Sequence, residues 1–187
     1  MSDRSIRSIA IVGGGTAGWM AACLLSQTLR GTGCAITLVE SPDIATVGVG
    51  EATIPPIFDF LKLIEVDLDA FIPATQATFK LGIKFDDWRA IGDSYWHPFG
   101  TFGVSIDRRP FHHVFHKARA QGLDPTAPQF SLAAALGDAG RLAHPDPRVP
   151  GPLAGLRQAL HFDAVLVARF LRDHAERRGV RRLEREV

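Results

Sequence analysis

The sequence of 187 residues has little of what membrane, secreted or nucleic-acid-binding proteins need. Its two cysteines, Cys23 and Cys34, have no metal or redox spacing, so neither a disulfide framework nor a thiolate metal site is expected. A net charge of +1 gives no electrostatic argument for a nucleic-acid or anionic-membrane partner. No apolar run is long enough to span a bilayer, and the short run near the N-terminus meets glycines at once, unlike a signal peptide. These absences favour a cytoplasmic protein that contains no metal site.

The sequence has enough apolar residues for a hydrophobic core. Its first forty residues predict a strand, a helix and a second strand. Hydrophobic residues make up 46% of the chain. The apolar run 9–12 predicts a strand, residues 16–30 predict a helix that ends at Gly31 and Gly33, and AITLVE at 35–40 predicts a second strand. Such a unit is typical of an α/β protein with a parallel sheet.

The remaining pattern is less regular. Residues 41–55 contain too much glycine, proline and threonine for regular structure and predict a long loop. Short helices are expected at 56–64 and 68–73, and a half-buried strand at 79–88, where apolar and polar residues alternate. A helix at 110–121, a proline-rich loop at 144–152, a helix at 163–178 capped by Asp163 and a last strand at 180–187 complete the expectation.

The glycines between the first strand and the first helix have the spacing Gly13-x-Gly15-x-x-Gly18. In dinucleotide-binding folds the first glycine permits the tight turn, the second lets a pyrophosphate approach the backbone, and the third lets the helix pack on the sheet. The helix N-terminus then offers free N–H groups to the anion. Glu40, at the end of the second strand, is placed to accept hydrogen bonds from ribose hydroxyls and would repel a 2′-phosphate. The motif therefore predicts FAD or NAD rather than NADP.

Two groups of titratable residues stand outside this motif. The alternation at 79–88 places Lys80 and Lys84 on the face opposite the apolar residues, where lysines are ordinarily solvent-exposed, and Gly82 between them leaves room on that face. His112 and His116 are four residues apart, but no third ligand is apparent, so no metal site is expected.

Several spaced segments together resemble the flavin-dependent tryptophan halogenases. They are GGGTAGW at 13–19, VGVGEATIP at 47–55, ATFKLGIKFDDW at 77–88, HPFG at 97–100 and HFDAVLVARFLRDHAERRGV at 161–180. The last segment is shared more widely with flavin monooxygenases of similar fold. The resemblance implies an FAD-binding, Rossmann-like α/β fold of the glutathione-reductase/monooxygenase type.

The resemblance also implies a reaction and its residues. In such enzymes reduced FAD and oxygen convert halide to hypohalous acid, and a lysine delivers the halogen to tryptophan or an indole-like aromatic compound. The matching lysine is Lys80, and Lys84 is left as a structural residue. His97 and Phe99 match positions that line the substrate pocket, and a separate flavin reductase is implied as the source of FADH2. The cofactor-binding positions are Gly13, Gly14, Gly15, Thr16, Ala17, Gly18, Glu40, Glu51, Ala52 and Val187.

The sequence departs from the family in ways that leave two alternatives open. Family members are far longer, and neither the W-x-W-x-I-P motif nor the glutamate that works with the lysine is found here. The chain is therefore expected to be the N-terminal part of one FAD-binding domain, covering 1–187. A flavin monooxygenase of the same fold and a non-catalytic FAD-binding fragment remain alternatives. The exposed edge of the last strand could pair with a second copy to form a homodimer.

Overall fold

The computed structural model describes residues 5–42, 51–123 and 127–186, and the chain folds as two compact units. The first comprises residues 1–78 and 160–187, and the second comprises residues 79–159. The chain leaves the first unit within strand β4 (Thr78–Lys80) and returns within strand β7 (Ala159–Phe162).

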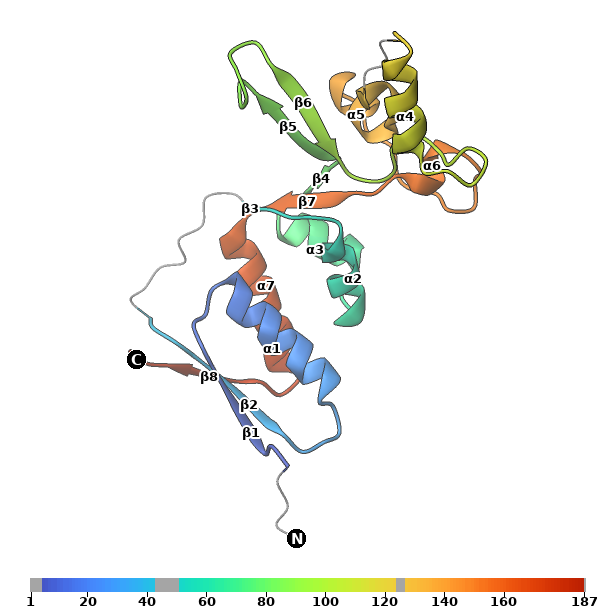
Figure 1. The fold of residues 1–187 in the computed structure, drawn as a ribbon. Helices are drawn as coiled ribbons and strands as arrows, with labels where there is room; N and C mark the ends of the chain where they lie inside the picture. The colour runs from blue at the N-terminus through green and yellow to red at the C-terminus, as the bar shows by residue number, and fades with distance from the viewer. Residues whose placement is uncertain (1–4, 43–50, 124–126, 187) are drawn as a thin grey trace. The chain divides into compact units, whose positions relative to one another are not determined.

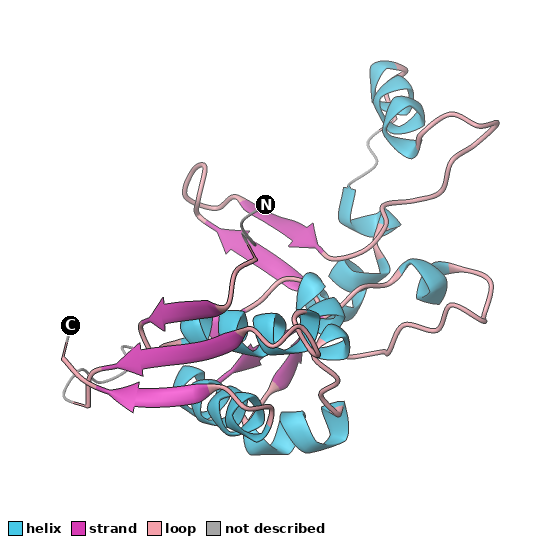
Figure 2. Ribbon diagram, turned by 90° about the horizontal axis from the view of Figure 1, so that it is seen from below, coloured by secondary structure: helices cyan, strands magenta, loops and turns pink. Residues whose placement is uncertain are grey.

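The first unit is built on a parallel sheet of three strands. These are β1 (Ser8–Val12), β2 (Ala35–Glu40) and β8 (Arg181–Glu184), in the order β1-β2-β8. The three arrows point the same way in Figure 2. The predicted α/β class with a parallel sheet is confirmed, and β2 ends at Glu40 as the sequence pattern predicts.

Two helices pack side by side on this sheet. They are α1 (Thr16–Thr28) and α7 (Ala164–Arg177) (Figure 1). Trp19, Leu38 and Leu171 are almost completely buried, and the buried Cys23 thiol donates to the Leu171 carbonyl at 3.2 Å. Burial raises the pKa of that thiol to about 12, against a weaker opposing effect of the nearby Arg178 charge. Cys23 is therefore a packing residue of the core, as its place in an apolar helix suggests.

The remaining helices and strands of the first unit agree only in part with those that the sequence predicts. Residues 41–55 were expected to be loop, but Glu51–Ala52 forms a short strand, β3, paired antiparallel with β7. Helices α2 (Pro56–Leu63) and α3 (Leu68–Ala74) follow as predicted. Asp163 caps α7 by accepting from the N–H groups of Val165 and Leu166 at 2.8 and 2.9 Å. Strand β7 itself was not anticipated, because only four residues form it and its partner lies far away in the sequence.

The second unit shows where the alternating pattern was misleading. The predicted single strand 79–88 is interrupted at Leu81 and forms β4 and then β5 (Gly82–Asp86). Strand β5 pairs antiparallel with β6 (Ser94–Pro98), which was not predicted. Helix α4 (Phe111–Ala120) agrees with expectation, whereas α5 (Leu132–Asp138) was missed and α6 (Pro152–Gly155) begins at the end of the proline-rich segment. A 3-10 turn at Ala127–Phe130 completes the unit.

Within the described ranges, no helix has both the length and the apolar character that crossing a membrane requires. The longest of these helices, α7, has 14 residues. A helix that spans a bilayer needs about 20.

The contact between Gly18 and the turn at Gly13 generates a stability prediction. A Cβ at Gly18 would overlap the backbone carbonyl oxygen of Gly13, whereas a Cβ at Gly15 would meet nothing within 4 Å. We expect Gly18→Ala to lower the free energy of unfolding by roughly 1–3 kcal/mol, because backbone cannot yield as a flexible side chain can. Chemical denaturation of both variants measures this, and Gly15→Ala is the matched control. Equal stability of the two variants would contradict the packing role of Gly18.

Candidate cofactor site and candidate catalytic lysine

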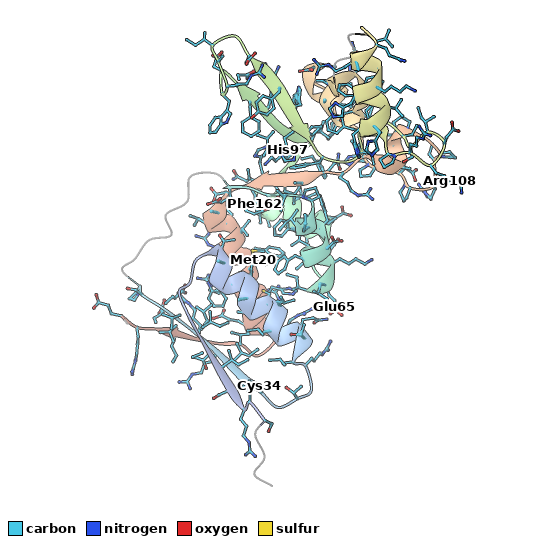
Figure 3. The ribbon with its side chains drawn as sticks, in the orientation of Figure 1. Met20, Cys34, Glu65, His97, Arg108 and Phe162 are labelled. Atoms are coloured by element: carbon cyan, nitrogen blue, oxygen red, sulfur yellow. The ribbon has the colours of Figure 1, made fainter. Side chains whose placement is uncertain are left out.

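A cavity in the first unit lies over the glycine-rich turn. Its volume is about 670 Å³. Two of its lining residues, Met20 on α1 and Phe162 at the end of β7, are labelled in Figure 3. The lining residues are Gly13, Gly14, Gly15, Thr16, Ala17, Met20, Glu40, Ser41, Glu51, Ala52, Thr53, Phe162 and Ala164. The structure describes nine of the ten sequence-predicted cofactor positions and brings eight of them together at this cavity. The ninth, Gly18, packs α1 below the turn.

The glycines of the turn are required for different physical reasons. Gly13 has φ +112°, a conformation that side-chain-bearing residues rarely adopt. A Cβ on Gly14 would overlap the Glu40 carboxylate, and one on Gly18 would overlap the Gly13 carbonyl. Gly15 has an ordinary φ of −72° and open space around it. The fold itself therefore does not require glycine at 15, and the open space above it is where a ligand could approach the backbone.

Helix α1 begins at this cavity and offers its N-terminus to it. Gly15 is the N-cap residue, and in the described part of the chain no side chain caps the helix there. The first N–H groups of the helix are therefore suited to an anion, which the helix dipole also favours. The Thr16 hydroxyl donates to the Ala164 carbonyl at 3.3 Å, so the starts of α1 and α7 are joined at the rim of the cavity.

Glu40 stands at the end of β2 and is mostly buried, with 14% of its side chain exposed. One carboxylate oxygen, Oε1, accepts from Nε of Arg182 on the neighbouring strand β8. The other, Oε2, lies over Gly14. A carboxylate this buried needs such a partner, because an unpaired charge is costly away from water. Arg182 was not anticipated, since only strand pairing brings β8 beside β2.

Strand β3 and its neighbours form the opposite wall. The Thr53 hydroxyl donates to the Leu160 carbonyl at 2.8 Å and accepts from the Leu160 N–H at 2.9 Å, which ties β3 to β7. Glu51 and Ala52 are thereby held at the cavity as predicted positions. Residues 43–50 of the predicted flavin loop, and Val187, lie outside the described residues. Phe162 and Ala164 were missed, although the segment 161–180 that contains them had been noted as shared among flavoproteins.

Lys80 lies in the second unit and is buried, not solvent-exposed as the alternating pattern predicted. Only 7% of the residue is exposed, and its Nζ lies 5.5 Å from the ring centroid of Phe99. Burial lowers the pKa of the ammonium group. The prediction failed because the break at Leu81 separates β4 from β5, so Lys80 does not share the exposed face of Lys84. An ammonium group over an aromatic ring in a poorly hydrated place is held in position yet is easier to deprotonate than a surface lysine.

Gly82 and Lys84, on β5, have structural roles. A Cβ at Gly82 would lie 2.7 Å from both the His97 carbonyl oxygen and Pro98 Cα, so glycine permits β6 to approach and does not open a cavity beside Lys80. Lys84 is exposed and forms an ion pair with Asp138 at 3.2 Å. The Trp96 indole donates to the same carboxylate at 2.9 Å, which joins the β5–β6 hairpin to the end of α5.

An apolar cavity of about 240 Å³ lies next to Phe99 within the second unit. Phe99, Phe130 and Leu156 contribute apolar side chains to it, and Gly103 and Gly155 contribute backbone. Its lining is predominantly apolar, as in many small-molecule sites. Of the two sequence-predicted substrate residues, Phe99 lines this cavity, whereas His97 is an exposed residue of β6 (labelled in Figure 3).

Helix α4 carries His112, His113 and His116, and none of them forms part of a metal-ligand cluster in the described residues. The side chains of His112 and His113 lie close together, with ring centroids 4.0 Å apart. Throughout the described ranges, no three His, Cys, Asp or Glu side chains are grouped so that they could hold a metal ion.

Known proteins share this arrangement over nearly the whole chain. Residues 8–187 match the family model of the tryptophan halogenases. The chain is 39% identical to tryptophan 7-halogenase RebH of Lentzea aerocolonigenes over 97% of its own length and 36% of RebH. The solved structures of the flavin-dependent halogenases BrvH from Brevundimonas sp. BAL3 and Xcc4156 from Xanthomonas campestris match with TM-scores of 0.89 and 0.84 and identities of 43% and 46%. They cover 99% and 97% of this chain, which spans 36% and 35% of theirs. The chain belongs to the tryptophan halogenase family.

Proposed function

We propose that this chain is the FAD-binding and lysine-bearing part of a flavin-dependent halogenase that acts on tryptophan or an indole-like aromatic compound. The observation that carries the proposal is the burial of Lys80 against Phe99, within a segment that matches the family. A lysine with only a structural role would more often be exposed, as Lys84 is. The chain spans about a third of its relatives' length, so the activity is proposed for a protein of their length that contains it.

The residues of the first unit fit FAD. The open backbone at Gly15 and the uncapped start of α1 would receive the pyrophosphate, and Glu40 would accept from the ribose hydroxyls. Glu51 and Ala52 are assigned to the flavin ring, and Val187, outside the described residues, to the adenine end. A carboxylate at position 40 disfavours a 2′-phosphate, which supports FAD and argues against an NADP-type cofactor.

When bound in its reduced form, FAD supplies the chemistry that converts halide and oxygen to hypohalous acid. A separate flavin reductase is proposed as the source of the reduced cofactor. Lys80 acts on the product of that chemistry. Its ammonium form donates a hydrogen bond to the hypohalous acid, while its neutral amine can form an N–halogen bond with release of water. Because burial lowers the pKa of Lys80, the neutral amine is more accessible here than on a surface lysine.

The role of Lys80 is then positioning of the electrophile beside one ring carbon. Transfer of halogen to the aromatic ring releases a ring proton and regenerates the amine, so Lys80 is unchanged after each cycle. We assign the aromatic substrate to the apolar cavity beside Phe99, with His97 as a second contact carried over from the family. Holding both reactants in one geometry is what accelerates the step.

Binding of FAD tests the first part of the proposal. Gly15→Val would place a branched side chain where the pyrophosphate approaches, and we expect its affinity for FAD to fall by at least about tenfold, or about 1.4 kcal/mol. Gly15→Ala should show a smaller loss. Fluorescence titration of this chain measures the affinity, and thermal unfolding shows that the variants are folded, as the open space at position 15 predicts. If Gly15→Val binds FAD as tightly as the unchanged chain does, the assignment of the pyrophosphate to this turn is wrong.

Halogenation tests the second part, in a protein that carries this chain within a length like that of its relatives. We expect Lys80→Ala to reduce halogenated product by roughly 100-fold or more, while oxidation of the reduced flavin continues. Lys84→Ala is the matched control and should retain most activity, because Lys84 is exposed and paired with Asp138. Mass spectrometry of the product beside absorbance of the flavin separates the two effects. Substantial halogenation by Lys80→Ala would disprove the assignment.

A further inference from the structure

Two acidic residues face each other across the parallel strands β2 and β8. Glu40 and Glu184 are register partners, and Arg182 is the partner of Leu38, two residues earlier on each strand. Because side chains alternate between the faces of a strand, all four of these side chains share one face. Like charges directly opposite each other on neighbouring strands repel. A positively charged group is therefore needed to offset the repulsion between the Glu40 and Glu184 carboxylates.

Arg182 is that group. Its Nε donates to Oε1 of Glu40, and its Nη2 pairs with Oε1 of Glu184 at 2.6 Å. Only 27% of the Arg182 side chain is exposed, so this planar guanidinium is held between two fixed acceptors. The Glu40 backbone is also fixed, because its carbonyl accepts from the Arg185 N–H at 2.9 Å.

Arg182 acts on the cofactor cavity only through Glu40. Glu40 lines the cavity, whereas Arg182 is not among the described residues that do. With Oε1 committed to Arg182, the carboxylate keeps one orientation, in which Oε2 lies over Gly14. That is the oxygen left to accept from a ligand.

We propose that Arg182 is a positioning residue of the ribose site: it fixes the Glu40 carboxylate so that one oxygen is presented to the ribose hydroxyl of an adenine nucleotide. This inference rests on the proposed function, since it assumes that Glu40 binds ribose. Without Arg182, the repulsion from Glu184 would drive the Glu40 side chain away from the turn, and the hydroxyl would lose its acceptor.

The test uses two probes that differ by one hydroxyl, ADP and 2′-deoxy-ADP, titrated into this chain by calorimetry. The wild-type chain should bind ADP more tightly. Arg182→Met should weaken ADP by about tenfold and leave 2′-deoxy-ADP nearly unchanged, so that the discrimination between the probes is lost. A merely structural role for Arg182 would weaken both probes alike, and that result would overturn the inference.

Two further variants make the result specific. Arg181→Met, at the exposed neighbouring arginine of β8, is the matched control and should keep full discrimination. Arg182→Lys should retain part of it, because one ammonium can pair with Glu40 but cannot bridge both acids in the same plane. This variant also carries the test if Arg182→Met does not fold. Full discrimination in Arg182→Lys would contradict the inference.

Glu40→Ala separates this inference from the proposed function, because alanine has no side-chain group that can bond a hydroxyl. If Glu40 binds the ribose, Glu40→Ala should abolish discrimination, and adding Arg182→Met to it should have no further effect. If Glu40→Ala keeps full discrimination, or if ADP does not bind the wild-type chain, the proposed ribose site is wrong and the inference is wrong with it. If Glu40→Ala loses discrimination and Arg182→Met keeps it, the ribose site stands and only the role of Arg182 is wrong.

Discussion

The arrangement of the first unit depends on one close approach, between Gly18 at the start of α1 and the carbonyl oxygen of Gly13. It sets the helix directly against the turn that leaves β1, so the helix N-terminus opens beside the ends of the parallel strands. Ligands of open α/β sheets bind at that edge. Any side chain at position 18 would force the helix away from the turn at Gly13 and shift its first N–H groups relative to Glu40. The packing of the helix on the turn and the open helix N-terminus thus depend on the same few residues, although each glycine is required for its own reason.

Burial decides the chemistry of the two lysines in the family-matching segment. Lys80 and Lys84 are four residues apart, yet Lys80 lies against the Phe99 ring with 7% exposure, while 42% of the Lys84 side chain is exposed in its ion pair with Asp138. The first environment disfavours the charged form and fixes the side chain. The ion pair of Lys84 is exposed, so it contributes little stability beyond joining the hairpin to α5. Residue type alone therefore does not distinguish the buried lysine from the exposed one.

The sequence predicted best those features that neighbouring residues determine. The turn at Gly13, helix α1 and the end of β2 at Glu40 follow from local spacing, and the capping of α7 follows from Asp163. Strands β3 and β7 were missed because each is short and is stabilised by a partner more than a hundred residues away, as Thr53 and Leu160 show. The burial of Lys80 was missed for a related reason. The alternating pattern continues through Leu81, and only the structure shows that the strand does not.

The same long-range dependence runs through the cofactor site. The glycines at 13, 14, 15 and 18 are sufficient for a turn, but one returning segment, β7-α7-β8, completes the cavity. Phe162 and Ala164 supply part of its lining, the Ala164 carbonyl accepts from Thr16, and β8 brings Arg182 to Glu40. Helix α7 also closes the core over Cys23 and Leu38. The glycine motif therefore gives the position at which a nucleotide can approach, while the geometry of the polar groups around it depends on residues that the chain supplies some 150 positions later.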